Sequence, residues 1–163
     1  MAELIIDSNY YNKLDIEGFS KMMSSPSYCY KFYWLEVIVQ LISANRTEAT
    51  YDEIINKMIA NAWFPVQEYH IHLSGIYGDG DVKDNLEKAV SRLYELTQLP
   101  SNANEIQIMN KLAEFSDDKE LHSYKTELTK NVPYKALSGF ANKGTEKINL
   151  ESSAGRMIAY YNK

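Results

Sequence analysis

The chain has 163 residues, of which 45% are hydrophobic, 24% are charged and only 11 are glycine or proline, and its net charge is −5. This composition excludes collagen-like, low-complexity and globally disordered proteins, and the length fits one domain or two small ones. No apolar stretch approaches the roughly 18 residues of a membrane span, the N-terminal residues lack signal-peptide features, and the single cysteine, Cys29, fits a reducing compartment. We therefore expect a globular, cytoplasmic protein.

The first strong helical signal lies in residues 28–44, where apolar residues recur at spacings of three and four. They fall into two stripes, so we expect a helix that is apolar on nearly all sides and lies in the middle of a bundle. A strand is the alternative, because the segment is rich in aromatic and β-branched residues, but its length favours a helix. Ser27 is the expected N-cap. One stripe holds Tyr28, Phe32, Leu35, Val39 and Ile42, and the other holds Tyr30, Trp34, Val37, Ile38 and Leu41.

The next helix is expected to begin after Thr50, because Thr50 and Glu53 have the spacing of a capping box. It should end before Pro65, since a proline disfavours helical geometry in the residue that precedes it. Residues 65–80 are then the main loop, which is rich in glycine and holds a short alternation, from Val66 to Leu73, typical of a strand or an extended connection.

Three further helices are predicted in the second half of the chain. The first begins near Asp81 or Asp84 and ends before Pro100; the second opens at residues 102–105, with Ile106, Met109 and Leu112 on one face; and the third opens at residues 117–120 and stops before Pro133.

We therefore predict an all-α fold, a compact multi-helix bundle with a central apolar helix and one glycine-rich loop. Residues 1–140 are expected to form the helical domain, and residues 141–163 a polar, mildly basic tail or linker.

The loop contains residues of the types that bind metals. On an extended segment His70 and His72 point the same way, and Asp79 and Asp81 follow them. The spacing does not fit a calcium-binding EF-hand loop, however. The interpretation that we favour is a loop whose aspartates cap the next helix, so we assign no metal site and no cofactor.

The sequence shows no motif of a known catalytic class. Cys29 lies among aromatic residues and is expected to be a buried structural thiol. The nucleophile elbow G-x-S-x-G, the dinucleotide fingerprint G-x-G-x-x-G and the phosphate-binding Walker loop do not occur. We therefore assign no catalytic residue to this chain.

Four segments, taken in order, carry a family resemblance: residues 27–34 (SYCYKFYW), 57–66 (KMIANAWFPV), 72–74 (HLS) and 132–137 (VPYKAL). Together they resemble the helical N-terminal region of bacterial HNH endonuclease-domain proteins, over about residues 15–140 of this chain. The sequence departs from that pattern in having two residues between Gly75 and Gly78, Lys135-Ala136 in place of Arg-Phe, and Gly139 where a proline is frequent.

The resemblance implies a non-catalytic accessory module of an HNH-type nuclease system, which positions the nuclease or binds a partner or DNA. In that family the catalytic module, with its histidines and metal, lies C-terminal to this region, and no histidine follows Phe140 here. A piece of a longer protein and a stand-alone relative are both compatible with this. The motif residues expected to hold the helices together are Trp34, Trp63, Phe64, Pro65 and Tyr134.

Two other functions fit the residues. A stand-alone protein–protein interaction domain, with a homo-oligomer among its forms, is favoured by the acidic charge and the 13 tyrosines. A metal-dependent hydrolase would use His70, His72 and the loop aspartates.

Residues 119–163 hold eight basic and four acidic side chains, so any DNA contact is expected there, at phosphates rather than bases. The candidates for that contact are Lys135, Lys143, Lys147 and Arg156.

Overall fold

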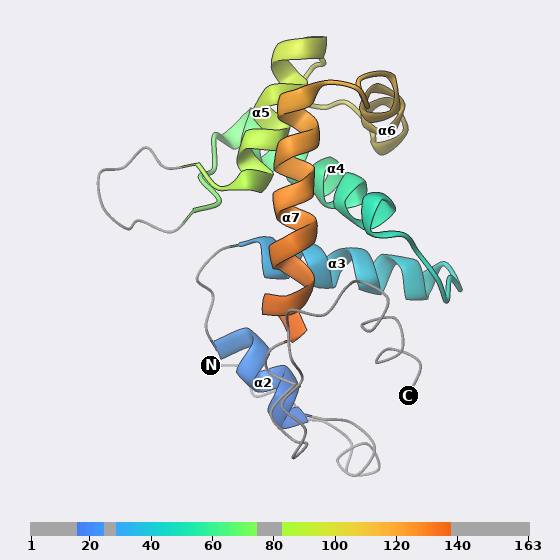
Figure 1. Cartoon of the computed structure of the whole chain (residues 1–163), viewed down its shortest axis with the longest axis vertical. Coiled ribbons are helices and arrows are strands. Elements are labelled where there is room, and N and C mark those ends of the chain that lie inside the picture. Colours follow the sequence, from blue (N-terminus) through green and yellow to red (C-terminus); the bar gives the residue numbers. More distant parts are fainter. Residues whose placement is uncertain (1–15, 25–28, 75–82, 138–163) are drawn as a thin grey trace. The chain divides into compact units, whose positions relative to one another are not determined.

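The computed structural model describes residues 16–24, 29–74 and 83–137, and within these ranges the fold is all-α, as predicted. None of the described helices is long and apolar enough to cross a membrane. Their bounds are α2 (Ile16–Ser24), α3 (Tyr30–Ser43), α4 (Tyr51–Tyr69), α5 (Asn85–Thr97), α6 (Glu105–Glu114) and α7 (Lys119–Leu137) (Figure 1).

The chain divides into two compact units. The first combines residues 1–24 with residues 137–163 and contains α2; the second is Ser25–Ala136, which contains α3 to α6 and all of α7 except its last residue. The predicted boundary at residue 140 lies outside the described residues. The candidate functional features described below all belong to the second unit, which we call the helical core unit.

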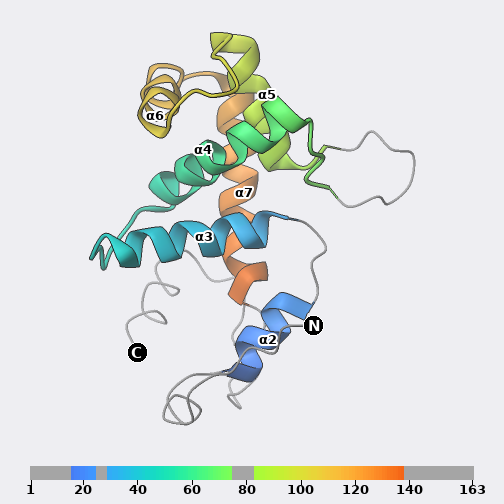
Figure 2. The same ribbon diagram turned by 180° about the vertical axis from the view of Figure 1, so that it is seen from behind.

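The centre of the helical core unit is α4, which contacts α3, α5 and α6 (Figure 2). One side of α4 is fully buried, and Trp63 at its centre donates a hydrogen bond from Nε1 to the carbonyl of Pro100, at 3.0 Å. This bond ties α4 to the turn that follows α5. Around Trp63 the buried side chains of α4 are Ile54, Ile55, Met58, Ile59, Ala62 and Val66, and α5, α6 and α7 add Leu86, Val90, Leu93, Ile108, Leu112, Leu121, Leu128 and Val132.

Side-chain caps start four of the helices. Thr50 accepts a hydrogen bond from the amide of Glu53, Asp84 from Glu87, Asn104 from Gln107 and Asp118 from Leu121, so each satisfies an amide that the first helical turn leaves unpaired. The predicted starts near Thr50 and Asp84 are therefore correct. The Ser27 prediction lies outside the described residues, and α3 follows Cys29, whose side chain makes no cap hydrogen bond.

Two predicted helix ends are wrong, and both involve proline. Helix α4 passes through Pro65 to Tyr69, and α7 passes through Pro133 to Leu137. A proline inside a helix removes one backbone hydrogen bond and costs about 3 kcal/mol. In each helix an adjacent valine is buried, Val66 at 8% exposure and Val132 at 0%. Burying one valine contributes about 1.5–3 kcal/mol, so this burial offsets much of the cost of the proline. The loop predicted at 65–80 consequently begins only after Tyr69.

Three helices end at a residue with left-handed backbone geometry that is not glycine. These residues are Asn45 after α3, His70 after α4 and Gln98 after α5, with φ between 50° and 55°. Glycine is the usual residue at this position, because a side chain makes the left-handed region less favourable. Gln98 offsets part of this cost because its side-chain nitrogen, Nε2, donates hydrogen bonds to the backbone carbonyls of Tyr94 and Glu95.

Replacing Trp63 by alanine should lower the free energy of unfolding by about 3–5 kcal/mol, because it leaves a cavity in the core and removes the hydrogen bond to Pro100. The neighbouring Phe64 is a matched control, since it is aromatic, lies in the same helix and is 42% exposed. Phe64→Ala should cost about 1 kcal/mol or less. Urea denaturation of both variants measures the difference, and equal losses would contradict the core described here.

Candidate functional site

Helix α3 carries three exposed large apolar side chains, more than any other described helix of the helical core unit. Of the two predicted stripes, the one that includes Tyr30, Trp34, Val37 and Leu41 is buried, and Trp34 contacts the ring of Tyr51. The other stripe is exposed: Phe32 is 41% exposed, Val39 53% and Ile42 65%, with Leu35 partly exposed between them. Among the described residues of the helical core unit, α3 is thus covered on one side only. We call the surface formed by Phe32, Leu35, Glu36, Val39 and Ile42 the outer face of α3.

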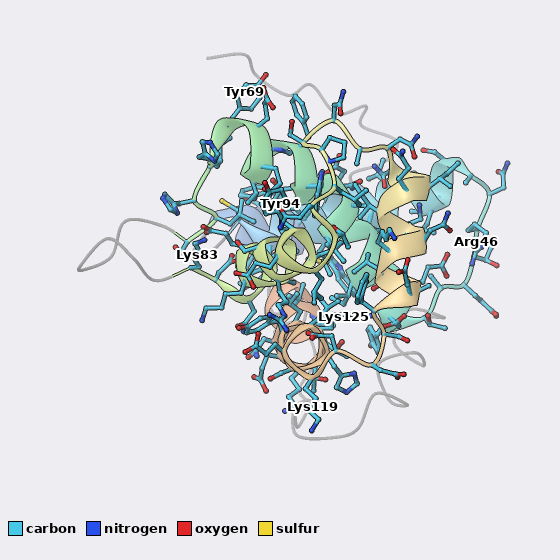
Figure 3. The ribbon with its side chains drawn as sticks, turned by 90° about the horizontal axis from the view of Figure 1, so that it is seen from above. Arg46, Tyr69, Lys83, Tyr94, Lys119 and Lys125 are labelled. Carbon is cyan, nitrogen blue, oxygen red and sulfur yellow. The ribbon has the colours of Figure 1, made fainter. Side chains whose placement is uncertain are left out.

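Most basic side chains of the helical core unit are paired with carboxylates. Lys125 of α7 lies 2.6 Å from Asp52, and Arg46, in the turn between α3 and α4, contacts Glu53 at 3.1 Å (Figure 3). Such pairing leaves little uncompensated positive charge to attract a phosphate backbone. The other pairs are Lys57–Glu105, Arg92–Asp118, Arg92–Glu120, Arg92–Glu95, Lys111–Glu114 and Lys130–Glu127.

The Arg92–Asp118 pair joins α5 to the start of α7. Arg92 donates from Nη2 to Asp118 at 2.8 Å, and Asp118 also accepts the amide of Leu121. The hydrogen bond from Arg92 is the main cause that lowers the pKa of Asp118 to about 2. Because this pKa is below its value in the unfolded chain, the pair stabilises the fold above about pH 4 and loses that effect as the pH falls toward 2.

A buried carboxylate fixes the segment that leaves α4. Glu87 of α5 is 2% exposed; one oxygen accepts the amide of Leu73 at 3.1 Å, and the other lies 3.0 Å from Nδ1 of His72. The carbonyl of Leu73 in turn accepts the amide of Cys29 at 3.3 Å. Residues 72–73 are therefore held between α5 and the start of α3, and both carboxylate oxygens of Glu87 are engaged in holding them.

Asp84 is the least satisfied ionisable group of this region. One oxygen accepts the amide of Glu87 at 2.8 Å, while the other is buried and has no hydrogen-bond partner among the described residues. Burial raises the pKa of Asp84, and the nearby charge of Glu87 adds to the effect. The Asp84 charge also contributes, after burial, to raising the pKa of the Cys29 thiol. Asp84 thus lies close to the first turn of α3.

The candidate metal ligands are not brought together in the part of the chain that the structure describes. His70 is exposed and forms the left-handed end of α4, while His72 pairs with Glu87. No group of three potential ligands that could hold a metal ion occurs among the described residues. Asp79 and Asp81 lie outside them. Asp84 caps α5, which agrees with the favoured interpretation of loop aspartates as helix caps.

The remaining predicted residues differ in their burial. Trp34 and Trp63 are buried between helices, as expected. Phe64 is instead exposed, and its ring packs edge-on against Tyr69 of the same helix, which lies at the outer edge of the helices in Figure 3. Pro65 is partly buried within α4. Tyr134 and Lys135 belong to α7, but their side chains lie outside the description, as do Lys143, Lys147 and Arg156 altogether.

Sequence reasoning missed two features of the helical core unit. The apolar stripe of Phe32, Val39 and Ile42 was recognised, but periodicity alone assigned it to the core. Glu87, the third residue after the cap Asp84, has the position of a capping-box glutamate, which reaches back to its own cap. Instead it reaches Leu73, fourteen residues earlier in the sequence.

Replacing Asp84 by asparagine should stabilise the protein at pH 7. Because burial raises the pKa of Asp84 in the folded state, the folded state binds the proton more tightly than the unfolded one, and stability falls as the pH rises through that raised pKa. Asparagine keeps the cap and removes the charge. Urea denaturation should show a gain at pH 7 that shrinks toward pH 4.

A second measurement checks the same variant. Without the Asp84 charge the Cys29 thiol should have a lower pKa. Because the thiolate is the reactive form, the folded variant should then be alkylated faster than the native protein at the same pH, in the absence of denaturant. Asp117→Asn serves as the control, since Asp117 is exposed. A variant that is less stable at pH 7, with unchanged thiol reactivity, would contradict the assignment.

No protein-family model, no curated protein and no solved structure matches the chain.

Proposed function

We propose that the helical core unit is a non-catalytic accessory module that binds a partner protein, and that its partner is the nuclease module of an HNH-type system in the cytoplasm. The observation that carries the binding role is the outer face of α3, where three large apolar side chains are more than two-fifths exposed. An apolar surface of this kind is typical of a protein–protein contact. The nuclease setting comes from the sequence resemblance alone.

The electrostatics support a protein partner over a nucleic acid for the helical core unit. Six of its basic residues form ion pairs with carboxylates, and the outer face of α3 carries a negative charge at Glu36. A surface with this charge distribution does not favour contact with phosphates. A stand-alone interaction domain, without a nuclease, is the second function that the same apolar surface supports.

The nuclease setting is tested with the HNH module encoded by the same gene or by the adjacent one. We expect that module and this chain to form a complex of one to one on size-exclusion chromatography with light scattering. An HNH module from an unrelated system is the control and should elute separately. If the cognate module also elutes separately, the nuclease setting is wrong and the stand-alone interaction domain becomes the better explanation.

DNA contact by residues 135–156 is a separate proposal with its own readout. Four phosphate contacts, from Lys135, Lys143, Lys147 and Arg156, predict that the logarithm of the binding constant falls with the logarithm of the salt concentration with a slope of roughly −3 to −4. A gel-shift series over salt measures this slope. The quadruple alanine variant should bind no DNA, while Lys111→Ala, in an ion pair on α6, should leave the slope unchanged. Absence of a shift at low salt would reject the contact.

A further inference from the structure

We propose that the outer face of α3 binds an amphipathic helix of a different protein, one that presents a lysine or arginine beside its apolar seam. The inference rests on the proposed role as an interaction module and adds the surface and the chemistry of its partner. Its basis is the spacing, exposure and charge of Phe32, Leu35, Glu36, Val39 and Ile42.

The four apolar residues of the outer face have the spacing of a coiled-coil seam. Phe32, Leu35, Val39 and Ile42 are separated by three, four and three residues, so they occupy the a, d, a and d positions of two heptads. Such a seam accepts another helix lengthwise, because its knobs fit the holes of a partner with the same repeat. At 1.5 Å per residue the seam is about 15 Å long, which corresponds to about three turns of a partner helix.

The seam is separate from the surface that α3 already uses. The opposite side of the helix, with Trp34 and Val37, is buried against the core of the helical core unit. None of the four seam residues is among the buried residues of the core or the partly buried hydrophobics packed against it. A partner could therefore dock on the seam without displacing any helix of the described core.

Glu36 determines the charge that the partner must carry. In the heptad set by Phe32 it occupies position e, next to the seam, where charged residues select the partner of a coiled coil. It is exposed, and no ion pair involving Glu36 occurs in the described parts of the chain. A helix with Lys or Arg facing Glu36 gains an ion pair on docking, whereas a helix with Glu or Asp there is repelled.

A second copy of this chain is the less favourable occupant. In an antiparallel pair of α3 helices, position e faces position e, so the two Glu36 carboxylates approach one another. In a parallel pair, Glu36 faces position g of the other helix, which is Lys31. That lysine is only 8% exposed, because it is buried within its own unit. Neither arrangement of two copies supplies an accessible positive charge for Glu36.

Two synthetic helical peptides test the proposal on the full chain. Both are about three heptads long, with leucine at every a and d position, and they differ only at e and g, which are lysine in one and glutamate in the other. We expect the lysine peptide to bind in fluorescence polarisation, and the glutamate peptide to bind at least about tenfold more weakly. Glu36→Lys should reverse this order of preference.

A matched pair of variants locates the binding surface. Ile42 on the outer face is 65% exposed, and Ile106 on α6 is 72% exposed, so neither change disturbs the core. Ile42→Gln should weaken binding of the lysine peptide about tenfold, and Ile106→Gln should leave it unchanged. The proposal is overturned if neither peptide binds, if Glu36→Lys leaves the preference as it was, or if both glutamine variants behave alike.

Sedimentation of the free protein tests whether a second copy of this chain occupies the outer face of α3. A dimer that Ile42→Gln dissociates would show that the outer face belongs to a second copy and would reject the proposal. The outcomes for the surface and for the nuclease setting remain distinguishable. Lysine-peptide binding without a complex with the HNH module supports the surface and rejects the nuclease setting. A complex that forms equally well with Ile42→Gln supports the nuclease setting and rejects the surface.

Discussion

Burial of Trp63 in the middle of α4 is the interaction on which the rest of the helical core unit depends. Its indole fills the space among α4 and the neighbouring helices, and its N–H satisfies the Pro100 carbonyl in the turn after α5. Because α4 contacts α3, α5 and α6, the position of each of these helices is defined relative to it. The outer face of α3 is exposed for the same reason, since α3 needs only one side to pack against α4.

The sequence was most informative where a local interaction decides the structure. Helix starts at Thr50 and Asp84 follow from side chains that accept nearby amides, and both were predicted. Helix ends at proline were predicted wrongly, because the cost at Pro65 and Pro133 is local while the burial that offsets it is tertiary. Tertiary packing also decides which hydrogen-bond partner a side chain selects. The carboxylate of Glu87, for example, accepts the amide of Leu73 in preference to that of its own helix cap.

The outer face of α3 illustrates a further limit of periodicity. A repeat of three and four identified both stripes of α3, but it carries no information on how many neighbours the helix has. Burial of Trp34 and exposure of Val39 are both compatible with the same pattern. The position of Glu36 beside exposed apolar side chains could be recognised only once the structure had shown which side of α3 is exposed. The role of His72 likewise follows from its contact with Glu87, and the spacing of the two histidines in the sequence did not indicate it.

The left-handed residues at the ends of α3, α4 and α5 bear on how far this protein can be stabilised. Asn45, His70 and Gln98 have a left-handed backbone geometry. Glycine adopts this geometry without a steric penalty, so each of the three side chains makes the folded state less stable than glycine would at the same junction. Selection that retains only the stability a protein requires permits such positions to persist. Substitutions at these three junctions could therefore raise the stability of the domain without changing its buried core or the outer face of α3.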